Sequence, residues 1–399
     1  MSNFLVLFSV SLFVYMGKGQ SNDADFDVTK FGAMPNTDIF QALTNAWKAA
    51  CGSTSQSQVL IPEETYKLSK IELTGPCKNR IQIQLQGILQ APADLAEDNW
   101  ISFKYIDQFT LTGKGVFDGQ GKVAWGKNDC AINPKCAKFA INVRFDFIKN
   151  AIVSDITSKD SKSFHFNVLG CKNLTFQNVN INAPENSPNT DGIHIGRSIG
   201  INVINTNIGT GDDCISLGDG SQQVAITNVT CGPGHGISVG SLGRYVGEAP
   251  VQGIRAKNCT LINTTNGVRI KTRPSSPSLG VASDIHFEDI IMVNVINPMV
   301  IDQEYCPSNQ CDKKNPSKVK ISNVSFTNIR GTAANALAVS FVCSSQFPCE
   351  DIKVTDINLT YNGSGDPISS TCKYVKPIVS GIQNPQICSS LVSSPSIPA

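Results

Sequence analysis

A short polar unit recurs between residues 150 and 360, and this repeat limits the folds open to the chain more than any other feature. Each unit is an Asn or Asp followed by a small or branched residue. Successive units lie 23, 27, 23, 30, 31, 39 and 28 residues apart. The units begin at Asp155, Asn178, Asn205, Asn228, Asn258, Asp289, Asn328 and Asp356. Repeats of this length are typical of solenoid proteins.

The stretches around these units alternate apolar and polar residues, as in Ile193-His-Ile195, Ile215-Ser-Leu217 and Val268-Arg-Ile270. Such alternation predicts short, half-buried strands. Leucine-rich repeats have a similar period, but their L-x-x-L-x-L signature and their helix in each repeat are missing. We therefore predict an all-β fold, a parallel β-helix. Alternate side chains would form its stacked core, and equivalent positions on successive coils would lie about 4.8 Å apart.

The two open ends of a β-helix need covers, because an unpaired strand edge recruits other chains. Residues 36–50 are predicted to form a helix that plugs the N-terminal end. Its apolar positions follow helical spacing: Ile39, Phe40, Leu43, Ala46 and Trp47. Residues 352–359 are predicted to form the last coil, with the cysteine-rich segment after them as the C-terminal shield.

The N-terminus has the pattern of a secretory leader. Residues 4–15 form an apolar run that is too short to span a membrane, and small residues suited to signal-peptidase cleavage follow it. No Lys or Arg precedes the run, so a buried first strand is the alternative. We predict a signal peptide over residues 1–19 and one β-helix domain over residues 20–399. No second apolar stretch reaches membrane-spanning length, so we expect a secreted protein that does not contact a membrane.

Cysteine usage also favours export, because fourteen cysteines occur without a repeated CxxC pair or nearby histidines that would indicate zinc. Four pairs that are close in sequence are predicted to form disulfides: Cys130/Cys136, Cys306/Cys311, Cys343/Cys349 and Cys372/Cys388. Seven N-x-[ST] sequons predict a glycosylated surface. They begin at Asn173, Asn228, Asn258, Asn263, Asn323, Asn358 and Asn362.

The charges of the chain nearly cancel, with 33 basic and 32 acidic side chains and a formal net charge of +1. This balance argues against a nucleic-acid-binding surface or an acidic tail. We expect a monomer that uses no cofactor and no metal ion.

Three strings align in register and bring chemically active side chains together: Asp191-Gly-Ile-His-Ile-Gly196, Asp213-Cys-Ile-Ser-Leu-Gly218 and His235-Gly-Ile-Ser-Val-Gly240. Their first residues are 22 positions apart, so two acids and a histidine are predicted to occupy one position on three consecutive coils. The next coil places Arg269 and Lys271 on the outward side of the same strand.

An Asp at this position can also be a simple turn former, like Asp155. A row of turn-forming Asp residues, however, needs neither the adjacent Asp212 and Asp213 nor a histidine and an Arg-x-Lys pair at the equivalent position of neighbouring coils. The combination predicts a functional site. Of the other histidines, His194 is expected to be a structural residue or a contact at the rim of this site.

Paired carboxylates suit glycoside hydrolysis, in which a protonated one donates to the leaving oxygen and the other activates a water. Arg269 and Lys271 would hold an anionic sugar, because a guanidinium binds a carboxylate through two parallel hydrogen bonds. The predicted substrate is therefore an acidic polysaccharide.

Four motifs resemble, in this order, the signature motifs of the polygalacturonases, the pectin-cleaving glycoside hydrolases: Asn189-Thr-Asp191, Gly211-Asp-Asp213, Gly234-His-Gly236 and Arg269-Ile-Lys271. The similarity extends from Phe26 to the final cysteines and is strongest to the plant branch. It implies a right-handed parallel β-helix and inverting hydrolysis of α-1,4-linked galacturonan (polygalacturonate, the backbone of pectin) in the plant cell wall.

The resemblance also implies roles for single residues. Asp212 would be the general acid, and Asp191 and Asp213 would orient and deprotonate the attacking water. His235 would tune the protonation of the acid and contact the sugar. Four further residues would bind galacturonate: Asn189, Arg269, Lys271 and Tyr305. A disulfide between Cys214 and Cys231 is implied as well.

The sequence context looks closer to the pollen-type exo-acting branch of the family than to the endo branch, so we expect removal of terminal galacturonate. Arg273 stands where plant relatives often carry an aromatic residue, and residues 306–311 lack an expected tryptophan. The segments 184–189 and 305–318 would wall off the cleft. An endo-acting enzyme, a calcium-dependent pectate lyase with the same fold, and a non-catalytic wall-binding β-helix remain as alternatives.

Overall fold

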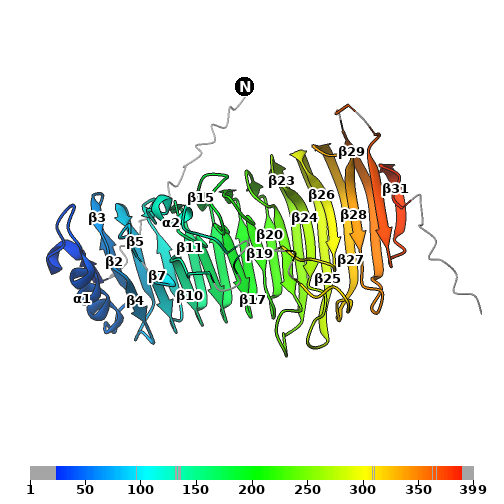
Figure 1. The fold of residues 1–399 in the computed structure, drawn as a ribbon. Helices are drawn as coiled ribbons and strands as arrows, with labels where there is room; N and C mark the ends of the chain where they lie inside the picture. Colours follow the sequence, from blue (N-terminus) through cyan, green and yellow to red (C-terminus); the bar gives the residue numbers. More distant parts are fainter. Residues whose placement is uncertain are drawn as a thin grey trace, which may run out of the picture.

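The structure is a computed structural model that describes residues 24–95, 97–130, 133, 136–307, 309, 311–361, 363–364 and 366–388. The predicted signal peptide and the sequon residue Asn362 lie outside the described residues. The described chain forms one elongated coil in which α1 lies at the N-terminal end and β31 near the C-terminal end (Figure 1). Among these residues, no helix is long and apolar enough to cross a membrane.

One parallel sheet of 11 strands runs along the coil and later carries the functional site. From the N-terminal to the C-terminal end its strands are β4 (Ile71–Thr74), β7 (Asn99–Lys104), β10 (Ile141–Asp146), β13 (Phe166–Leu169), β16 (Ile193–Gly196), β19 (Ile215–Leu217), β22 (Ile237–Leu242), β24 (Asn266–Thr272), β26 (Asn297–Asp302), β28 (Leu337–Val342) and β30 (Ser369–Lys373).

The remaining 20 strands join into a second sheet that bends around the core. They are β1 (Ala24–Asp27), β2 (Ser57–Ile61), β3 (Thr65–Lys67), β5 (Ile81–Leu85), β6 (Ile88–Gln90), β8 (Phe109–Thr112), β9 (Val116–Asp118), β11 (Lys149–Ser154), β12 (Thr157–Lys159), β14 (Lys172–Gln177), β15 (Asn180–Asn182), β17 (Ile199–Ile204), β18 (Asn207–Gly209), β20 (Gln222–Thr227), β21 (Thr230–Cys231), β23 (Val251–Ile262), β25 (Gly280–Val295), β27 (Val319–Ala333), β29 (Glu350–Thr360) and β31 (Ile378–Asn384). The predicted all-β, right-handed parallel β-helix is confirmed.

The recurring Asn and Asp residues mark the corners of the coil. All eight have a φ between 51° and 55°, a left-handed conformation that Asn and Asp adopt more readily than other non-glycine residues. Their side chains also join neighbouring coils. The Asn178 Nδ2 donates to Asp155 Oδ1 at 3.1 Å, and the Asn228 Nδ2 donates to Asn205 Oδ1 at 2.8 Å. The repeat therefore reflects a backbone requirement and a hydrogen-bonded ladder.

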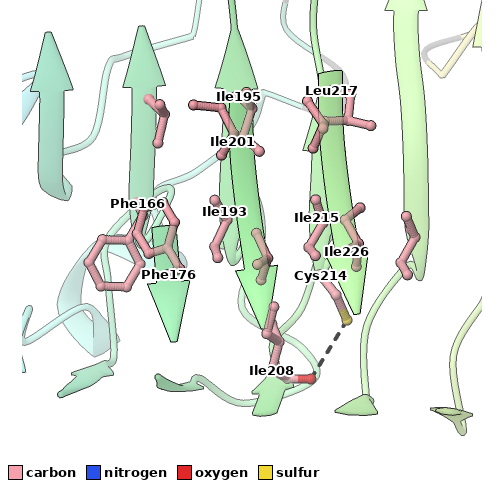
Figure 2. Packing of buried hydrophobic residues seen from close by; sticks show 14 of the residues in the cluster. Phe166, Phe176, Ile193, Ile195, Ile201, Ile208, Cys214, Ile215, Leu217 and Ile226 are labelled. Carbon is pink, nitrogen blue, oxygen red and sulfur yellow. Dashed lines mark hydrogen bonds between the residues drawn. The ribbon is translucent and has the colours of Figure 1, made fainter. Parts of the chain in front are cut away.

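The core is a stack of aligned apolar side chains, as Figure 2 shows for the central coils. Phe166, Ile193, Ile215 and Ile237 follow one another in register on β13, β16, β19 and β22. All four are fully buried. Because one coil repeats the inward pattern of the next, burial continues along the whole axis and fixes the register of the outward residues.

Aromatic stacking strengthens the core on the N-terminal side of the site. The Phe145 ring lies 5.5 Å from that of Phe103 and 5.9 Å from that of Phe176, and Phe145 is fully buried. Phe145→Ala is expected to lower the free energy of unfolding by about 3–5 kcal/mol in denaturant titrations. The matched change Phe147→Ala should cost far less, because Phe147 is 46% exposed and its ring stacks on Tyr105 at the surface. Equal losses for the two variants would contradict the described packing.

The N-terminal helix predicted over residues 36–50 forms as α1 (Phe40–Cys51), four residues later than predicted at its start, and the predicted inward residue Phe40 is exposed. Its buried residues, such as Leu43 and Trp47, face β1, β2 and β4, and the Trp47 ring lies 6.2 Å from that of Phe109. The function of α1 as a plug stays a prediction. Two shorter helices also occur: the 3-10 helix η1 (Val28–Phe31) and α2 (Lys122–Trp125).

The prediction that residues 352–359 form the last coil is wrong. After β29, which contains them, β30 pairs with β28 and β31 pairs with β29, so the stack continues by one more coil. Most residues of β31 are exposed. A terminal coil packs on one side only and does not need the apolar alternation that marks the inner coils, so the pattern did not reveal it.

Six disulfides form among the described residues. They include the four predicted from close spacing and the Cys214–Cys231 bridge implied by the resemblance. The sixth, Cys51–Cys77, joins the end of α1 to the segment before β5 and was not predicted, because its cysteines are 26 residues apart. Cys171 and Cys259 are buried free thiols.

Candidate active site

Asp191, Asp213 and His235 lie just before three consecutive strands of the 11-stranded sheet. Ile193 pairs with Ile215 on β19, and Ile215 pairs with Ile237 on β22. The three residues therefore occupy equivalent positions on adjacent coils, as the 22-residue spacing predicts.

Asp213 is the most enclosed carboxylate of the group, with 2% of its side chain exposed. The Lys271 Nζ lies 2.7 Å from Oδ2, and the Arg269 Nη2 and the Ser238 Oγ donate to Oδ1 at 2.9 and 2.8 Å. Burial alone would raise the pKa of Asp213, but the charges of Lys271 and Arg269 outweigh it and lower the pKa to about 2. Asp213 is therefore ionised in mildly acidic and neutral medium.

Asp191 has the opposite electrostatic environment. Burial is the main cause that raises its pKa well above the usual range, and the charges of Asp212 and Asp213 add to the effect. The Ser216 Oγ donates to Asp191 Oδ2 at 2.8 Å, and the His194 Nδ1 lies 2.7 Å from the same hydroxyl. Burial lowers the pKa of His194 to about 4, so its ring is neutral near neutral pH.

Asp212 and His235 form a pair that solvent can reach. The His235 Nδ1 lies 3.1 Å from Asp212 Oδ1, and the two side chains are 39% and 21% exposed. Burial alone would lower the pKa of His235, but its hydrogen bond to Asp212 and the charge of Asp212 raise the pKa above the ordinary value. This pair can hold a proton at the surface of the site, next to the ionised Asp213.

Ligand atoms of Asp212, Asp213 and His235 lie within 4.8 Å of one another, which is close enough for a shared metal ion. Both oxygens of Asp213, however, already accept hydrogen bonds from Ser238, Arg269 or Lys271. The donor set therefore fits a carboxylate fixed by protein cations better than a metal ligand.

Tyr305 closes the cationic side of the cluster. Its ring lies 5.2 Å from the Lys271 Nζ and 5.7 Å from the Arg269 guanidinium carbon. The Tyr305 backbone N–H donates to Thr272 O at 3.2 Å. These contacts place the ring beside both cations.

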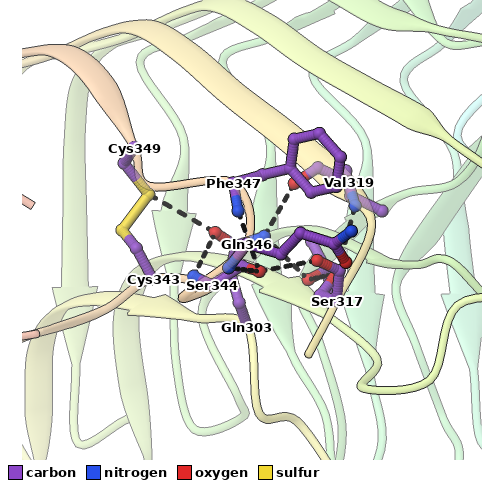
Figure 3. Close-up of a disulfide and its surroundings, with 9 residues drawn as sticks. Gln303, Ser317, Val319, Cys343, Ser344, Gln346, Phe347 and Cys349 are labelled. Atoms are coloured by element: carbon purple, nitrogen blue, oxygen red, sulfur yellow. Dashed lines mark hydrogen bonds between the residues drawn. A yellow bond between two sulfur atoms is a disulfide. The ribbon is translucent and has the colours of Figure 1, made fainter. Parts of the chain in front are cut away.

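A buried polar network supports the turn that carries Tyr305, next to the disulfide between Cys343 and Cys349 (Figure 3). The Gln303 Nε2 donates to Val319 O at 2.8 Å, and the Ser344 backbone N–H donates to Gln303 Oε1 at 2.9 Å. Gln303 thereby ties the turn after β26 to the start of β27 and to the segment after β28.

Asn189 lies on the opposite side of the cluster, in the segment between β15 and β16. Its φ of 57° places it in the left-handed region that Asn tolerates. The Asn128 Nδ2 donates to Asn189 Oδ1 at 3.1 Å and anchors the side chain to the segment after α2. All eight residues predicted for the site thus lie along one face of the coil.

The sequence did not single out Ser216 and Ser238, although they bind the two buried carboxylates. Both occupy the fourth position of the aligned strings, where His194 stands in the first string. The alignment contained this signal, but a serine in a strand has no distinctive chemistry until its partner is known. His194, expected to be structural or a rim contact, joins the site through Ser216.

The family model for glycosyl hydrolases family 28 matches residues 51–388. The chain belongs to this family.

Curated relatives support the assignment to glycosyl hydrolase family 28. The chain is 52% identical to an exopolygalacturonase of Platanus acerifolia over 92% of its own length and 98% of that protein. It is 55% identical to an exopolygalacturonase of Oenothera organensis, over 88% of its own length and 98% of that protein. Both relatives therefore match this chain over most of its length.

Solved structures agree on the fold. An exopolygalacturonase of Thermotoga maritima superposes with a TM-score of 0.75 at 18% identity and covers 91% of this chain and 92% of its own. An endo-xylogalacturonan hydrolase of Aspergillus tubingensis superposes with a TM-score of 0.74 at 24% identity and covers 88% of this chain and 99% of its own. Both solved structures therefore share their overall fold with the present chain.

Proposed function

We propose that this family 28 glycosyl hydrolase cleaves the α-1,4 linkages of polygalacturonate, the acidic backbone of pectin. One observation carries the proposal: three carboxylates meet in one cluster, and their environments differ sharply. Asp213 is held ionised by two cations, the pKa of Asp191 is raised, and Asp212 shares a hydrogen bond with His235. Hydrolysis of a glycosidic bond needs an acid and a base at the same pH. Carboxyl groups in such different environments can supply both.

In the proposed mechanism, Asp212 donates a proton to the glycosidic oxygen, and His235 sets the pH above which the pair loses that proton. Asp213 and Asp191 orient the attacking water, and Asp213 accepts its proton, because the raised pKa of Asp191 makes that carboxyl the poorer candidate for the ionised base. Asp213 suits this task because it stays ionised in acidic medium. Asp212 and His235 suit theirs because they remain accessible while Asp213 does not.

Arg269, Lys271, Tyr305 and Asn189 are proposed to bind galacturonate. Arg269 uses its Nε and Nη2 groups for Ser238 and Asp213, and Lys271 uses one donor for Asp213. Each cation keeps further N–H donors for a sugar carboxylate. Both residues would thus fix the catalytic carboxylate and the substrate together.

Inversion of the anomeric centre is proposed from the resemblance of the motifs. Inverting enzymes usually separate their two carboxylates by about 6.5–9.5 Å, whereas an oxygen of Asp212 and one of Asp213 lie within 4.8 Å here. Direct attack by Asp213 is nevertheless disfavoured, because both of its oxygens already accept hydrogen bonds. Proton NMR of the first product formed distinguishes the outcomes: the β-anomer indicates inversion, and the α-anomer indicates retention.

We further propose exo action from the non-reducing end by a monomer secreted to the plant cell wall, with residues 1–19 removed as a signal peptide. The names of the Platanus and Oenothera relatives support exo action, and the six disulfides support an oxidising compartment. Viscosity followed against reducing ends of polygalacturonate tests the exo proposal. Slow viscosity loss is expected, and a steep early loss with mixed oligomers would mean internal cleavage.

The pH profile should be bell-shaped with its maximum in mildly acidic medium. Activity falls as pH rises through the raised pKa of His235, above the ordinary value of about 6.5, because the Asp212–His235 pair then loses its proton. Asp213 keeps its charge down to about pH 2, so its protonation limits activity only in strong acid. Initial rates against pH test this expectation, and His235→Asn should move the alkaline limb to lower pH. Activity that stays flat into alkaline medium would contradict the assignment.

A further inference from the structure

A pocket of about 340 Å³ opens next to the carboxylate cluster, on its N-terminal side. Asn189 and Phe164 line it toward the cluster, and the Phe164 ring lies 5.1 Å from that of His194. Arg144 on β10 forms part of its wall, together with Asn128 and the disulfide-bonded Cys130. The pocket therefore shares Asn189 with the site and extends from it toward the N-terminal coils.

Arg144 has the same register as the outward residues of the site. It pairs with Asn167 on β13, which pairs with His194 on β16, and the row continues through Ser216 and Ser238 to Arg269. Arg144 and His194 are thus two strand spacings apart, or about 10 Å. A chain of anionic sugars laid along the row would meet a guanidinium at either end.

Arg144 has more donor capacity than the arginine on the other side of the cluster. Its Nε lies 2.8 and 3.0 Å from the two oxygens of Asp146, and within the described part of the chain its four Nη hydrogens have no protein partner. Arg269, in contrast, uses both Nε and Nη2 on Ser238 and Asp213. The Arg144 side chain is 25% exposed, so a ligand in the pocket can reach it.

The segment after α2 contributes Asn128 and Cys130 to the lining of the pocket. Asn128 bridges this segment to the 184–189 segment through Asn189 Oδ1 and Pro188 O, at 3.1 and 3.4 Å. Lys138 adds a second cation to the lining, and Asp98 is its one acidic residue. Among the described residues, the pocket thus holds two cations, and one of them is an accessible guanidinium.

We propose that Arg144 binds the carboxylate of a galacturonate unit of the bound chain that lies beyond the cluster, on its N-terminal side. Arg144 is thus a specificity-determining residue of the reaction. This inference rests on the proposed hydrolysis of polygalacturonate. A planar guanidinium with its Nη edge free matches a sugar carboxylate, since the pair forms two parallel hydrogen bonds.

Steady-state kinetics on trigalacturonate test the proposal with Arg144→Gln, which keeps an amide donor and removes the charge. KM should rise about 10- to 100-fold with kcat little changed, because a charged hydrogen-bonded contact is lost while the carboxylate cluster is intact. Arg144→Lys should fall between Gln and wild type, because the charge remains and the fork is lost. Arg255→Gln is the matched control, since Arg255 on β23 forms a similar pair with Asp284 on β25 and the change should leave KM unchanged.

A second variant separates substrate binding from support of Asp146, a carboxylate that is 8% exposed. Arg144→Gln leaves the Asp146 carboxylate without its cation, and the added change Asp146→Asn removes that buried charge. The double variant replaces the single variant in the test if the single variant fails to fold. Its KM should stay raised. A wild-type KM in this double variant, or in Arg144→Gln, overturns the proposal. Wild-type protein that does not cleave polygalacturonate would instead contradict the proposed function, so the two failures are distinguishable.

Discussion

Asp212→Asn is expected to lower kcat on polygalacturonate by at least about a hundredfold. General acid catalysis contributes roughly 10²–10⁴ to a rate, and an amide cannot donate the proton that the leaving oxygen requires. The fold should survive the change, because Asp212 is 21% exposed and an Asn oxygen can still accept a hydrogen bond from His235. Turnover measured at saturating substrate, with unfolding followed on the same preparation, provides the test.

The matched control for this variant is Asp155→Asn. Asp155 occupies a corner of the coil, where its Oδ1 accepts a hydrogen bond from Asn178, and an Asn oxygen preserves that contact. Activity of the control should equal that of wild type. A loss below about tenfold in Asp212→Asn would be too small for general acid catalysis and would assign the proton donor to another group.

Lys271→Met is expected to destabilise the protein by an amount near the lower end of roughly 3–5 kcal/mol, and also to impair activity. Lys271 is 7% exposed, and its ammonium lies 2.7 Å from an Asp213 oxygen that has no other partner among the described residues. Removing the ammonium leaves a buried carboxylate neutralised by Arg269 alone. Denaturant unfolding of the variant measures the loss.

Two further variants make the Lys271 result decisive. Lys271→Met combined with Asp213→Asn removes the buried charge and should regain much of the lost stability while remaining inactive. Lys353→Met is the surface control, because its pair with Asp351 is exposed and contributes at most about 1 kcal/mol. Wild-type stability in Lys271→Met would contradict the role of the ammonium in holding Asp213 ionised.

Much of the fold follows from the repeat, because each corner needs a left-handed residue and each strand needs an inward apolar row. Asp155 and Asn178 mark their corners on the sequence itself. The C-terminal coil did not follow, since β31 packs on one side and carries no such marker. The Cys51–Cys77 bridge also depends on how α1 folds back toward β5, which spacing does not specify.

The site was predictable as a set of positions but not as a set of contacts. Register brings Asp191, Asp213 and His235 to one face, because equivalent residues of a coil stack. Sequence assigned Arg269 and Lys271 to the sugar, whereas the structure shows both also bound to Asp213. Which partner a long cationic side chain reaches depends on its rotamer and on the neighbouring coil, and the spacing of residues in the sequence specifies neither.

The products of polygalacturonate digestion test the central proposal most directly. Chromatography and mass spectrometry of an early digest, with and without EDTA, should show saturated monogalacturonate as the main product and equal rates in both samples. An unsaturated product or a requirement for calcium would contradict hydrolysis and favour a lyase, and the absence of any product would indicate a β-helix that binds the wall without cleaving it.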